Sequence, residues 1–83
     1  LLPSGQWFLT DDLRARIARE GLSIRARTGG ERLRLADNRP SIDLKHAYQM
    51  YGIAPMLRGQ LPLLYDGERL VHVVGVGDVL PAH

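Results

Sequence analysis

The chain has 83 residues, no cysteine and a formal net charge of +2. That length suits one small domain, and the lack of cysteine excludes disulfides and thiolate metal sites. No apolar run is long enough to cross a bilayer and no signal peptide pattern is found, so we expect a cytoplasmic protein without a membrane partner. The chain opens on Leu1 rather than Met, and we expect it to be a piece of a larger protein.

Positive charge is concentrated in the middle of the chain. Residues 22–60 carry six arginines and Lys45 against three carboxylates, which gives +4, whereas residues 1–21 balance to zero and residues 61–83 carry −2. Ten of the eleven basic side chains are arginines, whose planar guanidinium suits phosphate better than a lysine ammonium does. This distribution favours an anionic partner for the middle segment.

The first segment contains a helix signal. Trp7-Phe8-Leu9 is typical of a short strand or a core plug. Thr10 predicts the N-terminal cap of a helix that ends before Gly21. Leu13 and Ile17 have helical spacing, although their alternation with arginines also allows an extended segment. We favour the helix.

An arginine-rich stretch follows, with the pattern of a hairpin. Apolar and basic residues alternate on both sides of Gly29-Gly30 (residues 22–27 and 32–35), and the two glycines allow the positive φ angles of a tight turn. A two-residue turn would set two pairs of arginines face to face: Arg27 with Arg32, and Arg25 with Arg34. Opposed like charges destabilise a sheet, so the pattern predicts an anion-binding face. Alternatively, Glu31, another carboxylate or solvent absorbs the repulsion, or a three-residue loop separates the two sets.

The next element is an amphipathic helix. Ser41 is its predicted N-cap, and Gly52 is its predicted end, with Ile53 packing beyond it. Its apolar stripe contains Leu44, Ala47, Tyr48 and Tyr51, with Lys45, His46 and Gln49 on the other side.

A second hairpin closes the pattern. A short helical turn and loop over residues 54–60 lead into strands at 61–65 and 68–74, joined by an Asp66-Gly67 turn. The nearly continuous apolar character of the return strand predicts a position inside the sheet.

These elements predict an α+β fold: a small antiparallel sheet built from two hairpins, with one main helix packed on it. We expect residues 1–21 to form an N-terminal segment packed on a domain of residues 22–83. The expected core contains Leu33, Leu35, Leu44, Ala47, Tyr48, Tyr51, Leu63, Val71 and Val73.

Catalytic motifs are absent from the sequence. The three histidines lack metal-ligand spacing, no serine lies in a nucleophile elbow, and no phosphate-binding glycine motif occurs. A binding module is therefore favoured over an enzyme, with no metal or cofactor of its own.

Several pieces, in order, resemble the C-terminal domain of bacterial tRNA(Ile)-lysidine synthetase over about residues 22–77. The pieces are Gly29–Arg34, Leu44-Lys45, Gly52–Arg58, Leu61–Tyr65 and Gly75. This chain departs from the family at Ala54 and Met56, where a second proline and a tryptophan are usual. It also lacks another arginine that is often found near Gln60, which puts one phosphate contact in doubt.

The resemblance implies a parent enzyme that activates the wobble cytidine of an isoleucine tRNA with ATP, after which lysine attacks to give lysidine. In that family ATP binds an N-terminal domain through a Ser-Gly-Gly-x-Asp-Ser loop, which this sequence lacks. The C-terminal domain holds the tRNA towards its acceptor stem. The implied partners are therefore the tRNA backbone and the other domains of the same chain, with the oligomeric state open.

The residues expected to contact the tRNA backbone are Arg25, Arg27, Arg32, Arg34, Lys45 and Arg58. The resemblance supports the last four, whereas Arg27 follows from the strand pairing alone. The helix N-terminus at Ser41 is a further predicted phosphate-binding site.

Some of these roles have structural alternatives. Glu31 pairs with an arginine or holds the turn, Arg58 caps loop carbonyls or touches RNA, and Tyr48 and Tyr51 belong to the core or stack on bases. Two other functions also remain open. One is a protein-interaction or dimerisation module that uses the edge of the second hairpin, and the other is an RNA-binding appendage of a different modifying enzyme.

Because the phosphate loop is missing, we expect this chain to form no lysidine and to release no pyrophosphate above background when it is incubated with ATP, lysine and tRNA. Formation of either product by the chain alone would contradict this prediction.

Overall fold

The computed structural model describes residues 9–82, so the predictions made for Trp7, Phe8 and His83 lie outside the described residues. Helix α1 (Asp11–Glu20) confirms the helical interpretation of the first segment. The Leu13 amide donates to the Thr10 hydroxyl at 3.2 Å, and Gly21 ends the helix at a left-handed φ of 68°.

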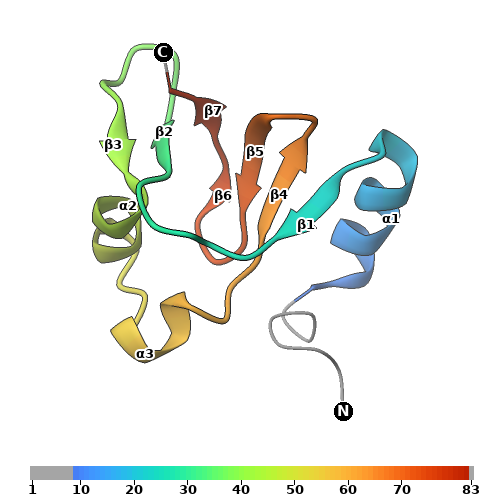
Figure 1. Cartoon of the computed structure of the whole chain (residues 1–83), viewed down its shortest axis with the longest axis horizontal. Helices are drawn as coiled ribbons and strands as arrows, with labels where there is room; N and C mark the ends of the chain where they lie inside the picture. Colours follow the sequence, from blue (N-terminus) through green and yellow to red (C-terminus); the bar gives the residue numbers. More distant parts are fainter. Residues whose placement is uncertain (1–8, 83) are drawn as a thin grey trace.

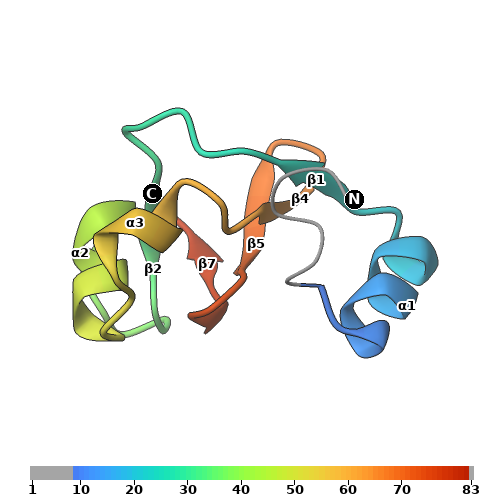
Figure 2. The same ribbon diagram turned by 90° about the horizontal axis from the view of Figure 1, so that it is seen from below.

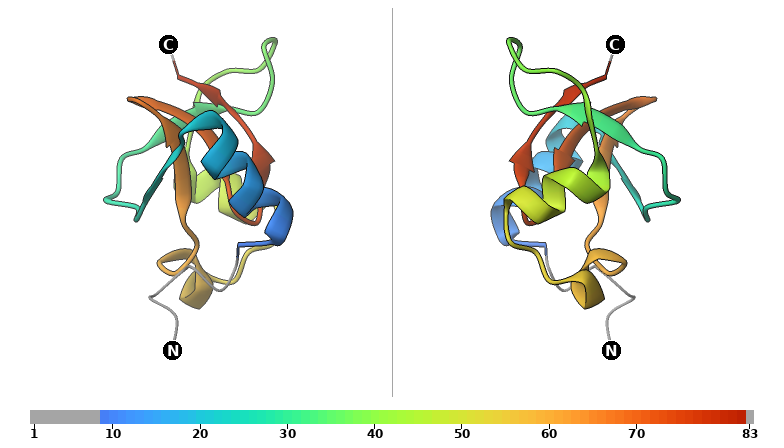
Figure 3. Two further views of the ribbon diagram at one scale, coloured as in Figure 1. Left: turned by 90° about the vertical axis from the view of Figure 1, so that its right-hand side faces the viewer. Right: turned by 90° about the vertical axis from the view of Figure 1, so that its left-hand side faces the viewer.

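In the described part of the chain, the strands form two antiparallel sheets. The larger sheet contains, in spatial order, β1 (Ser23–Arg25), β4 (Leu63–Asp66), β5 (Arg69–Val73) and β6 (Gly77–Asp78). The smaller sheet contains β3 (Ile42–Asp43), β2 (Arg32–Arg34) and β7 (Leu80–Pro81). Helices α1 and α2 (Leu44–Met50) lie at opposite ends of this arrangement (Figures 1 and 3).

The predicted arginine hairpin is wrong. Strand β1 pairs with β4, whereas β2 pairs with β3 and β7, and the segment between β1 and β2 crosses from one sheet to the other (Figure 1). The arginines therefore do not oppose one another: Arg25 faces Leu63, Arg32 faces Asp43 and Arg34 faces Leu80. Arg32 therefore lies opposite an acidic residue rather than another arginine, although the two side chains form no ion pair, and the predicted repulsion between arginines is absent from these strands.

The second hairpin is confirmed. Strands β4 and β5 join through a turn in which Gly67 has a positive φ of 62°, and Asp66 pairs with Arg69. Strand β5 lies inside the sheet, between β4 and β6. Strand β1 pairs with residues 63–65 of β4, and β6 pairs with residues 72–73 of β5, so both strands of this hairpin have a further neighbour in the sheet.

Helix α2 starts two residues later than predicted. Its N-cap is Asp43, whose carboxylate accepts the His46 amide at 2.8 Å, so the Ser41 cap is wrong. A negatively charged side chain occupies this helix start, which removes the basis for a phosphate site at Ser41. The end is confirmed: Gly52 has a φ of 67°, and the Ile53 amide donates to the Tyr48 carbonyl at 3.0 Å.

Helix α3 (Pro55–Arg58) confirms the short helical turn expected there, and it lies beside α2 in two views (Figures 1 and 2). None of the helices within residues 9–82 has the length and apolar character needed to cross a bilayer.

One apolar core joins the two sheets and the helices, and the α+β class is confirmed. Leu33, Leu44, Ala47, Tyr48, Leu63 and Val73 are buried in it as predicted, with Leu35 packed partly against it. Val71 is only half-buried and is not part of this cluster. Tyr51 is 50% exposed, contrary to prediction, because α2 ends at Met50 and Tyr51 lies where the chain turns away.

A surface carboxylate connects α1 to the larger sheet. Arg16 of α1 donates to Asp78 Oδ1 at 2.6 Å, and His72 Nδ1 of β5 lies 2.6 Å from the same oxygen. The hydrogen bond with His72 and then that with Arg16 hold the pKa of Asp78 below its usual range. Leu13 and Ile17 add apolar contacts between α1 and the core.

We expect Leu44→Ala to lower the free energy of unfolding by about 2–5 kcal/mol, because Leu44 is 1% exposed and its removal leaves a cavity. Urea denaturation of this chain measures the difference. Met56→Ala is the matched control: Met56 is 81% exposed, so its loss should change stability by no more than about 0.5 kcal/mol. Equal effects of the two substitutions would contradict the assigned core.

Candidate nucleic-acid interface

Two of the six predicted contact residues meet at one aromatic ring. The Arg27 guanidinium carbon lies 5.7 Å from the centroid of the Tyr48 ring, and that of Arg58 lies 5.9 Å from it. Arg27 comes from the segment between β1 and β2, whereas Arg58 is the last residue of α3. Both distances are within the range of cation–π attraction.

Tyr48 is fully buried, with 0% of its surface exposed. It therefore belongs to the core and offers no face on which a base can stack. Its hydroxyl has no hydrogen-bond partner among the described residues, so neither guanidinium donates to it. Burial raises the pKa of Tyr48, partly offset by the charge of Arg27.

Glu31 holds the turn, as one of the alternatives predicted. Its Oε2 accepts the Thr28 amide at 2.6 Å and the Thr28 hydroxyl at 3.0 Å, and its Oε1 accepts the Gly29 amide at 3.0 Å. The Glu31 carbonyl in turn accepts the amide of Leu44, at the start of α2, at 3.0 Å. Glu31 thus links Thr28, the residue after Arg27, to Leu44, the first residue of α2. Helix α2 also carries Tyr48.

The charge state of Glu31 reflects these bonds. Burial alone would raise the pKa of this carboxyl, but the hydrogen bonds from Thr28, Gly29 and the Glu31 amide outweigh it and leave the pKa below its usual range. Glu31 is therefore ionised in the folded state, and its negative charge is bound to backbone donors rather than to an arginine.

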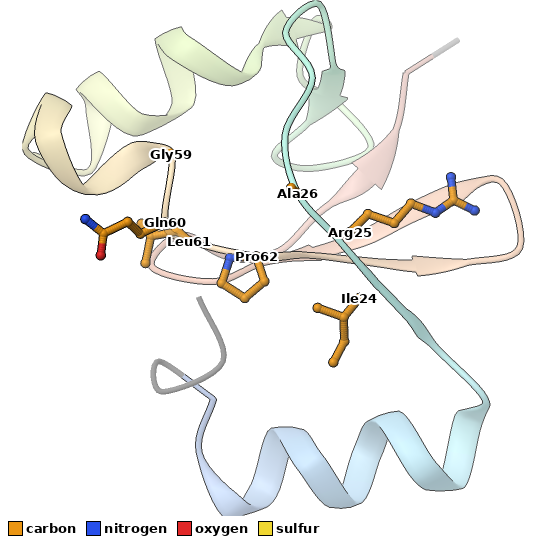
Figure 4. Close-up of a pocket in the computed structure, with 7 residues that line it drawn as sticks. All are labelled: Ile24, Arg25, Ala26, Gly59, Gln60, Leu61 and Pro62. Atoms are coloured by element: carbon orange, nitrogen blue, oxygen red, sulfur yellow. The ribbon is translucent and has the colours of Figure 1, made fainter. Parts of the chain in front are cut away.

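Arg25 lies apart from Arg27 and Arg58 and contacts a different tyrosine. Its guanidinium carbon is 4.2 Å from the centroid of the Tyr65 ring, one nitrogen donates to the Gly67 carbonyl at 2.8 Å, and Glu68 is 3.5 Å away. Figure 4 shows its side chain extending away from Gln60, along the β4–β5 hairpin. A hollow of about 250 Å³ lies beside it, between residues 24–26 and residues 59–62.

The two arginines of β2 differ in their freedom. Arg32 is exposed and donates to the Ser41 carbonyl at 3.0 Å. The Arg34 side chain is only 13% exposed; its Nε donates to the Pro81 carbonyl at 3.1 Å and its Nη1 to the Asp37 carbonyl at 3.3 Å. Arg34 therefore holds β7 and the loop after β2 in place, and presents little charge to a partner.

Lys45 is exposed on α2 and forms no ion pair with a described carboxylate. Arg39, in the loop before β3, is also exposed and forms no ion pair with a described carboxylate, although the sequence did not predict it as a tRNA contact. Arg39 and His46 border a hollow of about 220 Å³ with an apolar lining. The only sequence signal for Arg39 is its place in a turn-rich loop, where side chains are usually exposed.

Arg58 has the capping role that was one of the two considered for it. Its Nε donates to the Ile53 carbonyl at 3.0 Å, which ties α3 to the end of α2, while its guanidinium lies near Tyr48. Within residues 9–82 there is no cluster of three or more histidines and carboxylates that could hold a metal ion. The chemistry that the arrangement offers is the binding of anions.

The chain matches a known family over residues 22–79, and the description of that family is "TilS substrate C-terminal domain". The match covers more than half of the sequence, so the chain belongs to this family of C-terminal domains. No solved structure matches the chain.

Curated relatives give the enzyme in which such domains occur. The chain is 54% identical over 63 residues to a tRNA(Ile)-lysidine synthase of Ralstonia nicotianae. The aligned segment covers 76% of this chain and 14% of the relative. The chain is 49% identical over 61 residues to the enzyme of the same name from Xylella fastidiosa, covering 74% of the chain and 13% of the relative. The corresponding enzyme of Nitrosomonas europaea is 41% identical over 63 residues, covering 76% and 14%. The chain thus corresponds to a small part of these enzymes, their C-terminal region.

We expect Glu31→Gln to lower the free energy of unfolding of this chain at neutral pH, because the ionised carboxylate accepts hydrogen bonds from the turn. The folded-state pKa is lowered, so this contribution is complete above the ordinary glutamate pKa and is lost as the pH falls through the folded-state value. Urea denaturation of both forms across acidic to neutral pH measures the difference.

The control is Asp66→Asn, which removes an exposed carboxylate from the β4–β5 hairpin, away from the turn that Glu31 holds. A Glu31→Gln effect that stays constant over the whole pH range would show that ionisation of Glu31 does not stabilise the turn.

Proposed function

We propose that this domain binds the tRNA substrate of a parent tRNA(Ile)-lysidine synthase. The parent is the cytoplasmic ligase that uses ATP to convert the wobble cytidine of an isoleucine tRNA to lysidine. ATP and the chemical step belong to its N-terminal domain. The role of the present domain is to hold the tRNA backbone, towards the acceptor stem, beside the other domains of the same chain.

The observation that supports this proposal most strongly is the positive charge left without carboxylate partners. Among the described residues, five of the seven cations between positions 22 and 60 form no ion pair: Arg27, Arg32, Arg39, Lys45 and Arg58. The carboxylates nearby are engaged elsewhere, since Glu31 binds the turn and Asp43 caps α2. Phosphate groups are the partners that such guanidinium and ammonium groups favour.

The six proposed contacts are not equivalent. Arg27, Lys45 and Arg58, together with the exposed Arg32, have charge to offer to a phosphate. Arg25 already stacks on Tyr65 and lies near Glu68, and Arg34 is largely buried, so we expect both to act mainly by shaping the surface. Although Tyr51 is exposed, the proposed contacts come from arginine and lysine side chains, which suit the backbone of A-form RNA more than splayed bases.

The test is tRNA binding by the full-length parent enzyme over a series of salt concentrations. We expect Arg32→Ala and Lys45→Ala each to weaken binding and to lower the magnitude of the log–log salt slope by about 0.9 for each phosphate that the variant leaves unneutralised. Sequence preference should not change, because backbone contacts carry no base information.

Arg69→Ala is the matched control, since it removes an exposed arginine from the β4–β5 hairpin and should leave the slope unchanged. Arg34→Ala should instead lower the stability of the fold. If the Arg32 and Lys45 variants fold normally and show unaltered affinity and slope, these two side chains do not contact the tRNA backbone.

A further inference from the structure

The strongest unassigned feature is the approach of two guanidinium groups to the ring of Tyr48. Arg27 and Arg58 are 31 positions apart in the numbering (58 minus 27), yet both lie over one ring, at 5.7 and 5.9 Å from its centroid. Their neighbours in sequence also approach each other, because residues 24–26 and 59–62 border the same hollow (Figure 4). The fold, rather than local sequence, creates this juxtaposition.

Both guanidinium groups keep hydrogen-bond donors for a ligand. Arg27 makes no hydrogen bond or ion pair with a described residue, and Arg58 uses only its Nε, on the Ile53 carbonyl. The unpartnered Tyr48 hydroxyl shows that neither arginine donates to that oxygen. The Glu31 carboxylate also acts on Tyr48, but its oxygens are bonded to Thr28 and Gly29, which leaves the guanidinium donors of Arg27 and Arg58 for an anion.

The position of Arg27 depends on Glu31. The carboxylate of Glu31 binds the amides of Thr28 and Gly29, which directly follow Arg27, and its carbonyl binds the start of α2. Gly29 and Gly30 have φ angles of 93° and 82°, and because glycine loses more conformational freedom on folding than other residues, the turn depends on bonds such as those of Glu31. Glu31 therefore fixes the segment that brings Arg27 to Tyr48.

We propose that Arg27 and Arg58 bind a single phosphodiester group of the tRNA backbone, with the buried Tyr48 ring as their shared support and Glu31 as the positioning residue for Arg27. This inference rests on the proposed function and makes it more specific.

A double-mutant cycle in the full-length parent enzyme tests the shared phosphate. We expect Arg27→Ala and Arg58→Ala each to weaken tRNA binding by about tenfold, as for the loss of a charged hydrogen bond. Since both act on one group, the double variant should lose clearly less than the product of the two factors. Its salt slope should fall by about 0.9, as for one phosphate. Independent effects with about twice that change in slope, or no effect of either variant, would overturn the proposal.

Glu31→Gln provides a test of opposite sign for the positioning role. If Glu31 acted only through its negative charge, the loss of that charge would strengthen binding to the polyanionic tRNA. Positioning predicts the reverse: weaker binding in the wild-type background and no further loss when Arg27→Ala is already present. Asp66→Asn, which removes a carboxylate from the β4–β5 hairpin, should not weaken binding.

The outcomes separate this inference from the proposed function. If Lys45→Ala weakens tRNA binding while Arg27→Ala and Arg58→Ala do not, the domain binds tRNA but this site is wrong. If none of these variants changes binding, both proposals fail. The double-mutant cycle on Arg27 and Arg58 does not use the Glu31 variant. The shared phosphate site therefore remains testable even if Glu31→Gln prevents folding.

Discussion

Burial of one face of α2 is the constraint on which the rest of the domain depends. Leu44, Ala47 and Tyr48 lie in the same core as Leu33 of the smaller sheet and Val73 of the larger one. In the described part of the chain the two sheets share no ladder, and the common apolar core, the contacts between β5 and β7 and the passage of the chain from β6 into β7 hold them together. The ring of Tyr48 that completes the core also lies beneath the guanidinium groups of Arg27 and Arg58.

Elements with local signals were predictable from the sequence. Thr10 and Gly21 delimit α1, Gly52 and Ile53 end α2, and the turn at Gly67 joins two neighbouring strands; each signal lies within a few residues of the structure that it specifies. Strand partners were not predictable, because alternation identifies a strand and one buried face but not its neighbours. The apolar β4 has neighbours on both sides, and β1 supplies one of them from 38 to 42 positions away in the paired register (63 minus 25 and 65 minus 23).

The same distinction separates the charges that hold the fold from those that face solvent. The sequence shows six equivalent basic residues, but Arg34 is engaged because β7 returns to lie beside β2, and Arg58 is engaged because the chain turns sharply after α2. Neither contact has a signal in the flanking residues. For Glu31 the position next to Gly29-Gly30 does indicate a turn-holding role, and that alternative is the one observed.

The core contains no buried charged or polar residue among the described positions other than the tyrosine hydroxyl. Dissolved ions screen charges over about 10 Å at 0.1 M ionic strength, but they act weakly on apolar packing. The fold of the domain and the proposed binding of tRNA therefore respond differently to the ionic medium. A rise in ionic strength weakens the proposed phosphate contacts and leaves the apolar core in place, so release and rebinding of the tRNA would require no refolding.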